Sequence, residues 1–179
     1  MHLTPKWPFK IAVPFETEEV RNGIRRGNAA LEVFHNLNTE FGFVPVFAIA
    51  GRGSFPTASG SQGIDTTLKL IATKSLSDRE TDRLHVNFAW RRNGGREEGE
   101  RRNSYFAAIG YSRVFSSKTV LVADYVHEQE LEKGKAAQFI ELGLRQSLIP
   151  GTILSLGAGA GIGKDAPDFR VTLGIQLGF

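Results

Sequence analysis

Apolar and polar residues alternate along most of this chain with a period of two, and the 3.6-residue period of an amphipathic helix is rare. The alternation is clearest around residues 83–91, where Leu84, Val86, Phe88 and Trp90 share one face and His85, Asn87, Ala89 and Arg91 share the other. Successive side chains of a β-strand point to opposite faces of the sheet. Each such segment is therefore predicted to be a strand with one oily face.

Ten segments of the chain show this strand pattern. Most have the roughly 9–11 residues that a tilted strand needs to cross the hydrocarbon layer of a membrane, whereas strands of soluble proteins usually have about five or six. We expect strands at about Trp7–Phe15, Ala29–Asn38, Val44–Phe55, Thr66–Leu76, Arg83–Arg91, Tyr105–Val114, Thr119–Glu128, Gln138–Leu148, Thr152–Ile162 and Phe169–Phe179.

The links between these segments alternate between long and short. Long polar links are expected near 16–28, 56–65, 93–103, 128–134 and 165–168, and short links near 39–42, 76–81, 116–118 and 149–151. Outer-membrane barrels have short turns at one rim and longer loops at the other. The sequence therefore predicts an all-β fold: an antiparallel up-and-down transmembrane β-barrel of about ten strands, formed by residues 1–179 as a single domain.

A soluble β-domain is the main alternative, because a sandwich or a lipocalin-like barrel would bury the same apolar face inward. Glycine favours the membrane barrel: Gly157, Gly159, Gly161 and Gly163 are expected on the non-oily face of the ninth strand. A solvent-exposed face built of glycine would be weak, whereas the crowded interior of a barrel gives these glycines a purpose.

Charged residues of both signs occupy the polar face of the strands. An Arg or Lys on a lipid face near the midplane would cost roughly 2–4 kcal/mol, so these side chains are expected to point into the lumen. There they would either pair with one another and brace the barrel, or line a route for a solute. We favour bracing with partial lining by Lys69, His85, Arg91, Asp124, Glu128, Glu141, Arg145 and Arg170.

Composition excludes several other classes of protein. The chain has 22 Lys and Arg against 19 Asp and Glu, a net charge of +3, and the two signs are interspersed, so no nucleic-acid surface is indicated. Cysteine is absent, and the longest apolar stretch, at 41–51, is too short for a membrane helix.

Sequence motifs point to no enzyme, cofactor or metal. The segment AGAGIGKD at 158–165 fails as a phosphate-binding loop because Asp165 follows the Gly-Lys pair. The four histidines lack metal-ligand spacing, so no catalytic residue, metal or cofactor is expected.

Several stretches resemble a known family of bacterial outer-membrane proteins, the transporters of the phenol-degradation meta-pathway type. These stretches are LVADYVHEQE (121–130), IELGLRQSLIPGTILSLGAGAGIG (140–163) and DFRVTLGIQLGF (168–179), and the likeness extends upstream to about Ala29. The resemblance implies an outer-membrane barrel that passes small, often hydrophobic or aromatic molecules. Members of the family are longer, with further N-terminal strands, and this chain shows no signal peptide as written, so a truncated twelve-strand barrel is an alternative.

The last strand ends on an aromatic residue. Its Thr172, Gly174, Leu177 and Phe179 resemble the C-terminal signal that the barrel assembly machinery of the outer membrane recognises. The expected partners are therefore the lipid bilayer, the assembly machinery and a small-molecule solute. We interpret the chain as a passive outer-membrane pore; an outer-membrane enzyme or structural anchor and a soluble β-barrel binding protein are the alternatives.

Overall fold

A computed structural model describes residues 9–12, 15–18 and 21–177 of the chain. The described residues form β-strands, turns and links. They include no helix, and so no helix that is long and apolar enough to cross a membrane. The strands are β1 (Phe9–Ala12), β2 (Phe15–Glu18), β3 (Arg21–Arg26), β4 (Ala30–Asn36), β5 (Val46–Ser54), β6 (Asp65–Ser75), β7 (Asp82–Arg92), β8 (Asn103–Ser116), β9 (Thr119–Gln129), β10 (Ala136–Ile149), β11 (Thr152–Ile162) and β12 (Phe169–Leu177).

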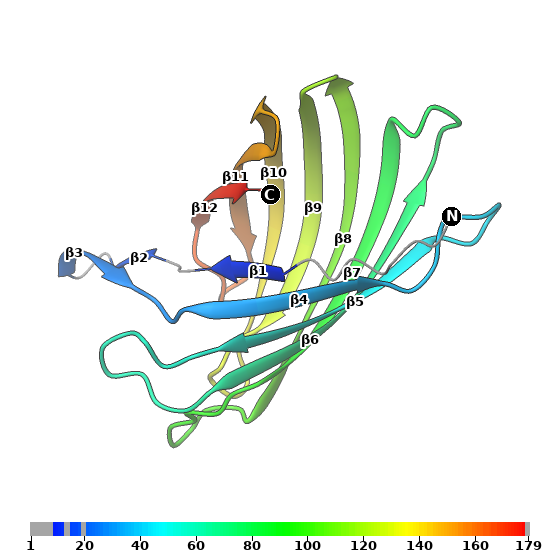
Figure 1. The fold of residues 1–179 in the computed structure, drawn as a ribbon. Coiled ribbons are helices and arrows are strands. Elements are labelled where there is room, and N and C mark those ends of the chain that lie inside the picture. The colour runs from blue at the N-terminus through cyan, green and yellow to red at the C-terminus, as the bar shows by residue number, and fades with distance from the viewer. Residues whose placement is uncertain (1–8, 13–14, 19–20, 178–179) are drawn as a thin grey trace.

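One antiparallel sheet contains ten of these strands (Figure 1). From β4 to β12 every strand pairs with the next one in the sequence, and β1 joins the edge beside β4. The strands of this sheet coincide with the ten predicted segments to within a few residues at each end. The structure confirms the all-β, antiparallel, up-and-down part of the prediction. The period-two pattern located the strands correctly.

The prediction of a polar link near 16–28 is wrong in part. This segment contains β2 and β3, which form a separate two-stranded hairpin that projects from the sheet (Figure 1). Its ladder aligns Glu16 with Arg25, whereas an apolar alternation is missing. The hairpin was not predicted because its strands lack the apolar face from which the other strands were predicted.

The ten-stranded sheet curls strongly, so that β4–β6 run almost across the direction of β9–β11 in Figure 1. It does not close: no ladder joins β1 to β12 among the residues that the structure describes. Each of these two strands therefore pairs with a single neighbour, β4 and β11 respectively. Closure into a barrel stays a prediction.

Links at the two rims of the sheet differ in length. At one rim the links are 37–45, 76–81, 117–118 and 150–151, and at the other they are 55–64, 93–102, 130–135 and 163–168. The links 117–118 and 150–151 are the shortest, and in the second Pro150 precedes Gly151, whose φ of 79° suits a type II turn. The link expected at 39–42 is longer than predicted, although Phe41 and Val44 close a tight turn within it.

The two faces of the sheet carry opposite kinds of side chain. We call the face with Lys69, Ala89 and Phe106 the inner face, and the face with Leu70, Phe88 and Leu142 the outer face. The buried hydrophobic residues of the described part are mostly small, namely Ala30, Ala48, Ala50, Ala89, Ala108, Val126, Ala137 and Phe139. By contrast, Leu70 is 53% exposed and Leu142 is 65% exposed.

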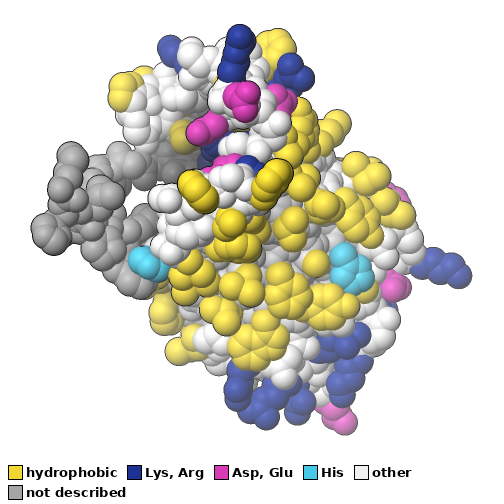
Figure 2. All heavy atoms as spheres, turned by 90° about the vertical axis from the view of Figure 1, so that its right-hand side faces the viewer, with side chains coloured by type: hydrophobic (Ala, Val, Ile, Leu, Met, Phe, Trp, Pro, Cys, Tyr) yellow, Lys and Arg dark blue, Asp and Glu magenta, His cyan; other side chains and the backbone are white. Residues whose placement is uncertain are grey.

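Figure 2 shows the outer side chains as a broad hydrophobic belt, with most Lys and Arg side chains above and below it. This arrangement is the reverse of a water-soluble protein, in which the large apolar side chains are the buried ones.

Glu40, in the link 37–45, ties this rim to the end of β6. Its carboxylate accepts hydrogen bonds from the Lys74 ammonium, from the Ser75 hydroxyl at 2.9 Å and from the Ser75 backbone N–H at 3.1 Å. The ammonium of Lys74 is the main reason that the pKa of Glu40 lies below its ordinary value. The ionised form is therefore the one that stabilises the fold.

This contact predicts an acid-dependent loss of stability. A carboxyl whose pKa is lowered by folding stabilises the protein above its ordinary pKa, about 4.3, and loses that contribution as the pH falls through the lower folded value. We expect wild type to be more stable than Glu40→Gln at pH 7, with the difference vanishing at acid pH. Urea unfolding of the refolded protein between pH 7 and pH 3 measures it, and a difference independent of pH would contradict the argument.

Candidate functional site

All eight charged or polar residues singled out by the sequence lie on the inner face. The ladders run from Lys69 on β6 through Ala89, Phe106 and Glu128 to Ala137 on β10 in one row across the sheet. A parallel row carries His85, Gly110, Asp124, Glu141, Gly159 and Arg170 from β7 to β12. Arg91 and Arg145 share the same parity on β7 and β10. The role of all eight as lumen-lining residues stays a prediction.

Arg170 is the centre of an ionic cluster that connects four strands. Its Nε donates to Oε1 of Glu141, and its Nη1 lies 3.5 Å from Oε2 of Glu128. The other oxygen of Glu128 lies 3.4 Å from Nη2 of Arg91. The Arg170 guanidinium also lies 3.9 Å from the centre of the Phe139 ring, a cation–π distance. Strands β7, β9, β10 and β12 are thus braced across the concave side of the sheet.

Glycines leave room for these side chains. A Cβ at Gly159 would lie 2.8 Å from Cγ of Glu141 and 3.0 Å from its Oε1. A Cβ at Gly110 would overlap the carboxylate of Asp124. Gly159 on β11 therefore provides a recess for the Glu141 side chain, which pairs with Arg170. Gly163, expected on the same strand, instead follows the end of β11 with φ 96°, so that prediction is wrong.

His85 is held between two hydroxyl groups on the neighbouring strands. Its Nδ1 lies 3.1 Å from Oγ1 of Thr73, and its Nε2 lies 2.7 Å from Oγ of Ser112. A neutral imidazole satisfies both contacts by donating through one nitrogen and accepting through the other. A serine nucleophile would need a carboxylate or amide behind the imidazole, but here Thr73 occupies that position. The contacts match a hydrogen-bonding role for His85.

The inner face also contains charged residues that the sequence reasoning missed, among them Glu32 and Arg52. Glu32 on β4 forms an ion pair with Lys69, and Arg52 on β5 lies directly opposite Glu32 in the ladder. Arg52 belongs to a glycine-rich end of β5, which obscured the apolar alternation. Counting by two from the buried Ala48 and Ala50 would have placed it on the inner face.

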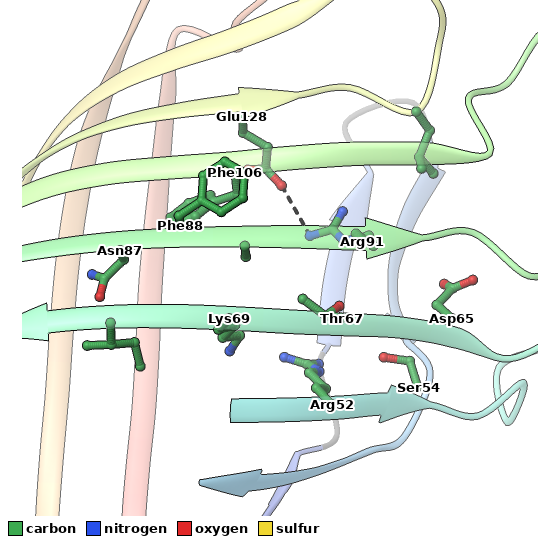
Figure 3. Close-up of a pocket in the computed structure, with 13 residues that line it drawn as sticks. Arg52, Ser54, Asp65, Thr67, Lys69, Asn87, Phe88, Arg91, Phe106 and Glu128 are labelled. Carbon is green, nitrogen blue, oxygen red and sulfur yellow. Dashed lines mark hydrogen bonds and ion pairs between the residues drawn. The ribbon is translucent and has the colours of Figure 1, made fainter. Parts of the chain in front are cut away.

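A cavity of about 520 Å³ lies on the inner face over β5, β6 and β7 (Figure 3). Three cationic side chains contribute to its wall, and hydroxyl, amide and apolar groups fill the spaces between them. Its main lining residues are Arg52, Ser54, Asp65, Thr67, Lys69, Asn87, Arg91, Phe106 and Glu128. In the described part of the chain no group of three His, Asp or Glu side chains is placed to hold a metal ion. Basic, acidic, polar and apolar groups thus all contribute to the wall of the cavity.

The residues of the C-terminal pattern lie partly on the same face. Thr172 and Gly174 pair with Gly157 and Ser155 of β11, and Leu177 ends β12 opposite Thr152. Phe179 lies outside the described residues.

The glycine recess predicts a sharp difference between two neighbouring substitutions. Gly159→Ala puts a methyl group against Glu141 and is expected to lower the free energy of unfolding by about 1–3 kcal/mol, as overpacking typically does. Gly157→Ala is the matched control, because the nearest atoms to its Cβ are 3.7 Å away. Urea unfolding of the refolded protein in phospholipid vesicles gives both values, and equal effects would refute the recess.

Comparison with known proteins adds no assignment: the chain matches no family model and no curated protein sequence.

Proposed function

We propose that this chain is an outer-membrane β-barrel that acts as a passive pore for small molecules. The observation that supports it most is the reversed distribution of side chains, with large apolar groups exposed on the outer face and charged groups gathered on the inner face. Exposed apolar patches of this extent are rare on monomeric proteins in water. In a bilayer the same belt faces the hydrocarbon, so the soluble alternative leaves it unexplained.

Aromatic side chains near both rims agree with this proposal. Aromatic girdles at the two interfaces flank the apolar band of membrane barrels. At the rim with links 55–64 and 93–102, the exposed aromatic residues are Phe55, Trp90, Tyr105 and Phe169. At the opposite rim, with links 37–45 and 117–118, they are Phe41, Phe43 and Phe115. The membrane would thus lie between these two levels.

The proposal includes closure of the sheet by β1 and β12. Unpaired backbone groups are not tolerated against lipid, so a spanning sheet must have no open edge. The sheet is strongly curled, as Figure 1 shows, so pairing its two edge strands would continue a curvature that the sheet already has. Pairing these two strands would satisfy both edges, and the C-terminal pattern ending in Phe179 would serve as the recognition signal for the assembly machinery.

Transport would occur by diffusion past the inner charges, without a cofactor. A barrel of about ten strands has a narrow interior, which side chains fill in part. The Arg170 cluster occupies one side of this interior, where its basic and acidic groups neutralise one another. The cavity over β5–β7 leaves space on the other side. The resemblance of the sequence to outer-membrane transporters agrees with such a path.

The direct test is conductance. Purified protein, refolded and added to a planar lipid bilayer, is expected to produce discrete current steps, because solvent and ions would cross through the cavity side of the lumen. Protein denatured by heat before addition is the control. Absence of current steps together with absence of solute uptake into proteoliposomes would refute the pore, though not the barrel.

A second test addresses the C-terminal signal. Deletion of Phe179 is expected to reduce the fraction of chains that insert into the outer membrane, and to change the urea stability of the folded barrel much less. Phe169→Ala is the control, because Phe169 is an exposed aromatic residue at the other end of the same strand. Heat-modifiable electrophoretic mobility measures insertion. Equal effects on insertion and stability would mean that Phe179 acts as an interfacial aromatic residue alone.

A further inference from the structure

The three cations of the cavity are balanced unequally by acidic side chains. Lys69 forms its ion pair with Glu32, and Arg91 lies 3.4 Å from Glu128, which it shares with Arg170. No ion pair or hydrogen bond joins Arg52 to any residue in the described part of the chain. Among the described residues Arg52 therefore has no direct ion pair of its own, because Glu32, which lies opposite it in the ladder, is paired with Lys69.

The register places this charge beside a second guanidinium with a hydroxyl group between them. Arg52 on β5 pairs with Thr67 on β6, and Thr67 pairs with Arg91 on β7. Neighbouring strands lie about 4.8 Å apart, so the two arginine backbones are about 10 Å apart across Thr67. Figure 3 shows Arg52, Thr67 and Arg91 side by side on three adjacent strands, with Lys69 one step along β6.

The acidic groups of the cavity do not fill this position. The carboxylate of Asp65 lies closer to the rim, where it accepts a hydrogen bond from the backbone N–H of Gly94 at 2.9 Å. Glu128 lies on β9, on the far side of Arg91, between Arg91 and Arg170. The space over Thr67 is thus bordered by cationic groups, and a bound anion would lower the repulsion between them.

We propose that this row binds the carboxylate of a small organic acid, with Arg52 as its principal ligand. Guanidinium groups bind carboxylates through two parallel hydrogen bonds, and the Thr67 hydroxyl supplies a further donor. Phe106 and Ile71 give the cavity an apolar part for the body of such a molecule. The inference rests on the proposed pore and names its solute class, because rings of Arg and Lys favour anions in pores.

The first experiment measures binding without conduction. Isothermal titration calorimetry with the refolded protein in detergent uses butanoate as the probe and butylammonium as its cationic counterpart. Wild type is expected to bind butanoate but not butylammonium. Arg52→Gln is expected to weaken butanoate binding about tenfold, which corresponds to the loss of one charge-assisted hydrogen-bond pair. Arg52→Lys keeps the charge and is expected to recover binding in part.

The matched control is Arg92→Gln. Arg92 lies at the same end of β7 as Arg91 but on the outer face, so its substitution removes the same charge without changing the cavity. Heat-modifiable mobility confirms that each variant is folded. Equal binding of butanoate by wild type and Arg52→Gln, no binding by wild type, or binding of butylammonium as strong as that of butanoate would each overturn the inference.

The second experiment separates this inference from the pore itself. In a planar bilayer with a KCl gradient, wild type is expected to show a reversal potential on the anion-selective side. Arg52→Gln should shift it toward cations, and Arg92→Gln should leave it unchanged. Current steps with no Arg52-dependent selectivity or binding would reject the carboxylate site and leave the pore standing. Arg52-dependent butanoate binding without any current would retain the site and reject the pore.

Discussion

The strict alternation of side chains between the two faces of a β-strand is the constraint on which the rest of this structure depends. Because the period is two, the register of each ladder decides which residues share a face. The ladders from β4 to β12 put Leu70, Phe88 and Leu142 on the outer face and Lys69, Glu128 and Arg170 on the inner face. A slip of one residue in any pair would move charged groups to the apolar side. The apolar belt and the ionic cluster therefore fix the register together.

Crowding on the concave side explains the unusual size distribution of the residues. A curled sheet brings inner side chains closer together than outer ones, so alanine and glycine alternate with the long charged chains. Ala50 and Ala89 flank Lys69 in its row, and Gly159 lies between Glu141 and Arg170. Large apolar residues are consequently displaced to the outer face. The shortage of large buried side chains is a result of curvature and not a sign of a weak core.

The sequence predicted the strands well because their main determinant is local. Alternation located the ten strands of the sheet, and the same parity placed Lys69, Arg91 and Glu141 on one face. It did not predict the β2–β3 hairpin, which lacks an apolar face. It also could not say which charges meet, because the Arg170–Glu128 and Glu32–Lys69 pairs depend on stagger and curl across strands far apart in the sequence. Arg52 was missed because Gly51 and Gly53, on either side of it, interrupt the alternation of apolar and polar residues.

Bracing and permeation make opposite demands on the same inner face. An ion pair that crosses several strands stiffens the sheet, yet it also occupies the space that a solute needs and cancels the charge that would attract it. In the proposed pore, the two demands would be compatible if the braced region and the path of the solute were separated in space. Arg170 and its acidic partners hold β9, β10 and β12 together at near neutrality, and the cavity lies on the other side, over β5–β7. The connection between the two regions is Glu128, which contacts both Arg91 and Arg170. Glu128 is shared by two guanidiniums, but Arg170 has a second carboxylate partner in Glu141, so two carboxylates face the two guanidiniums there. In the proposed pore, Glu128 would therefore mark the boundary between the braced region and the cavity.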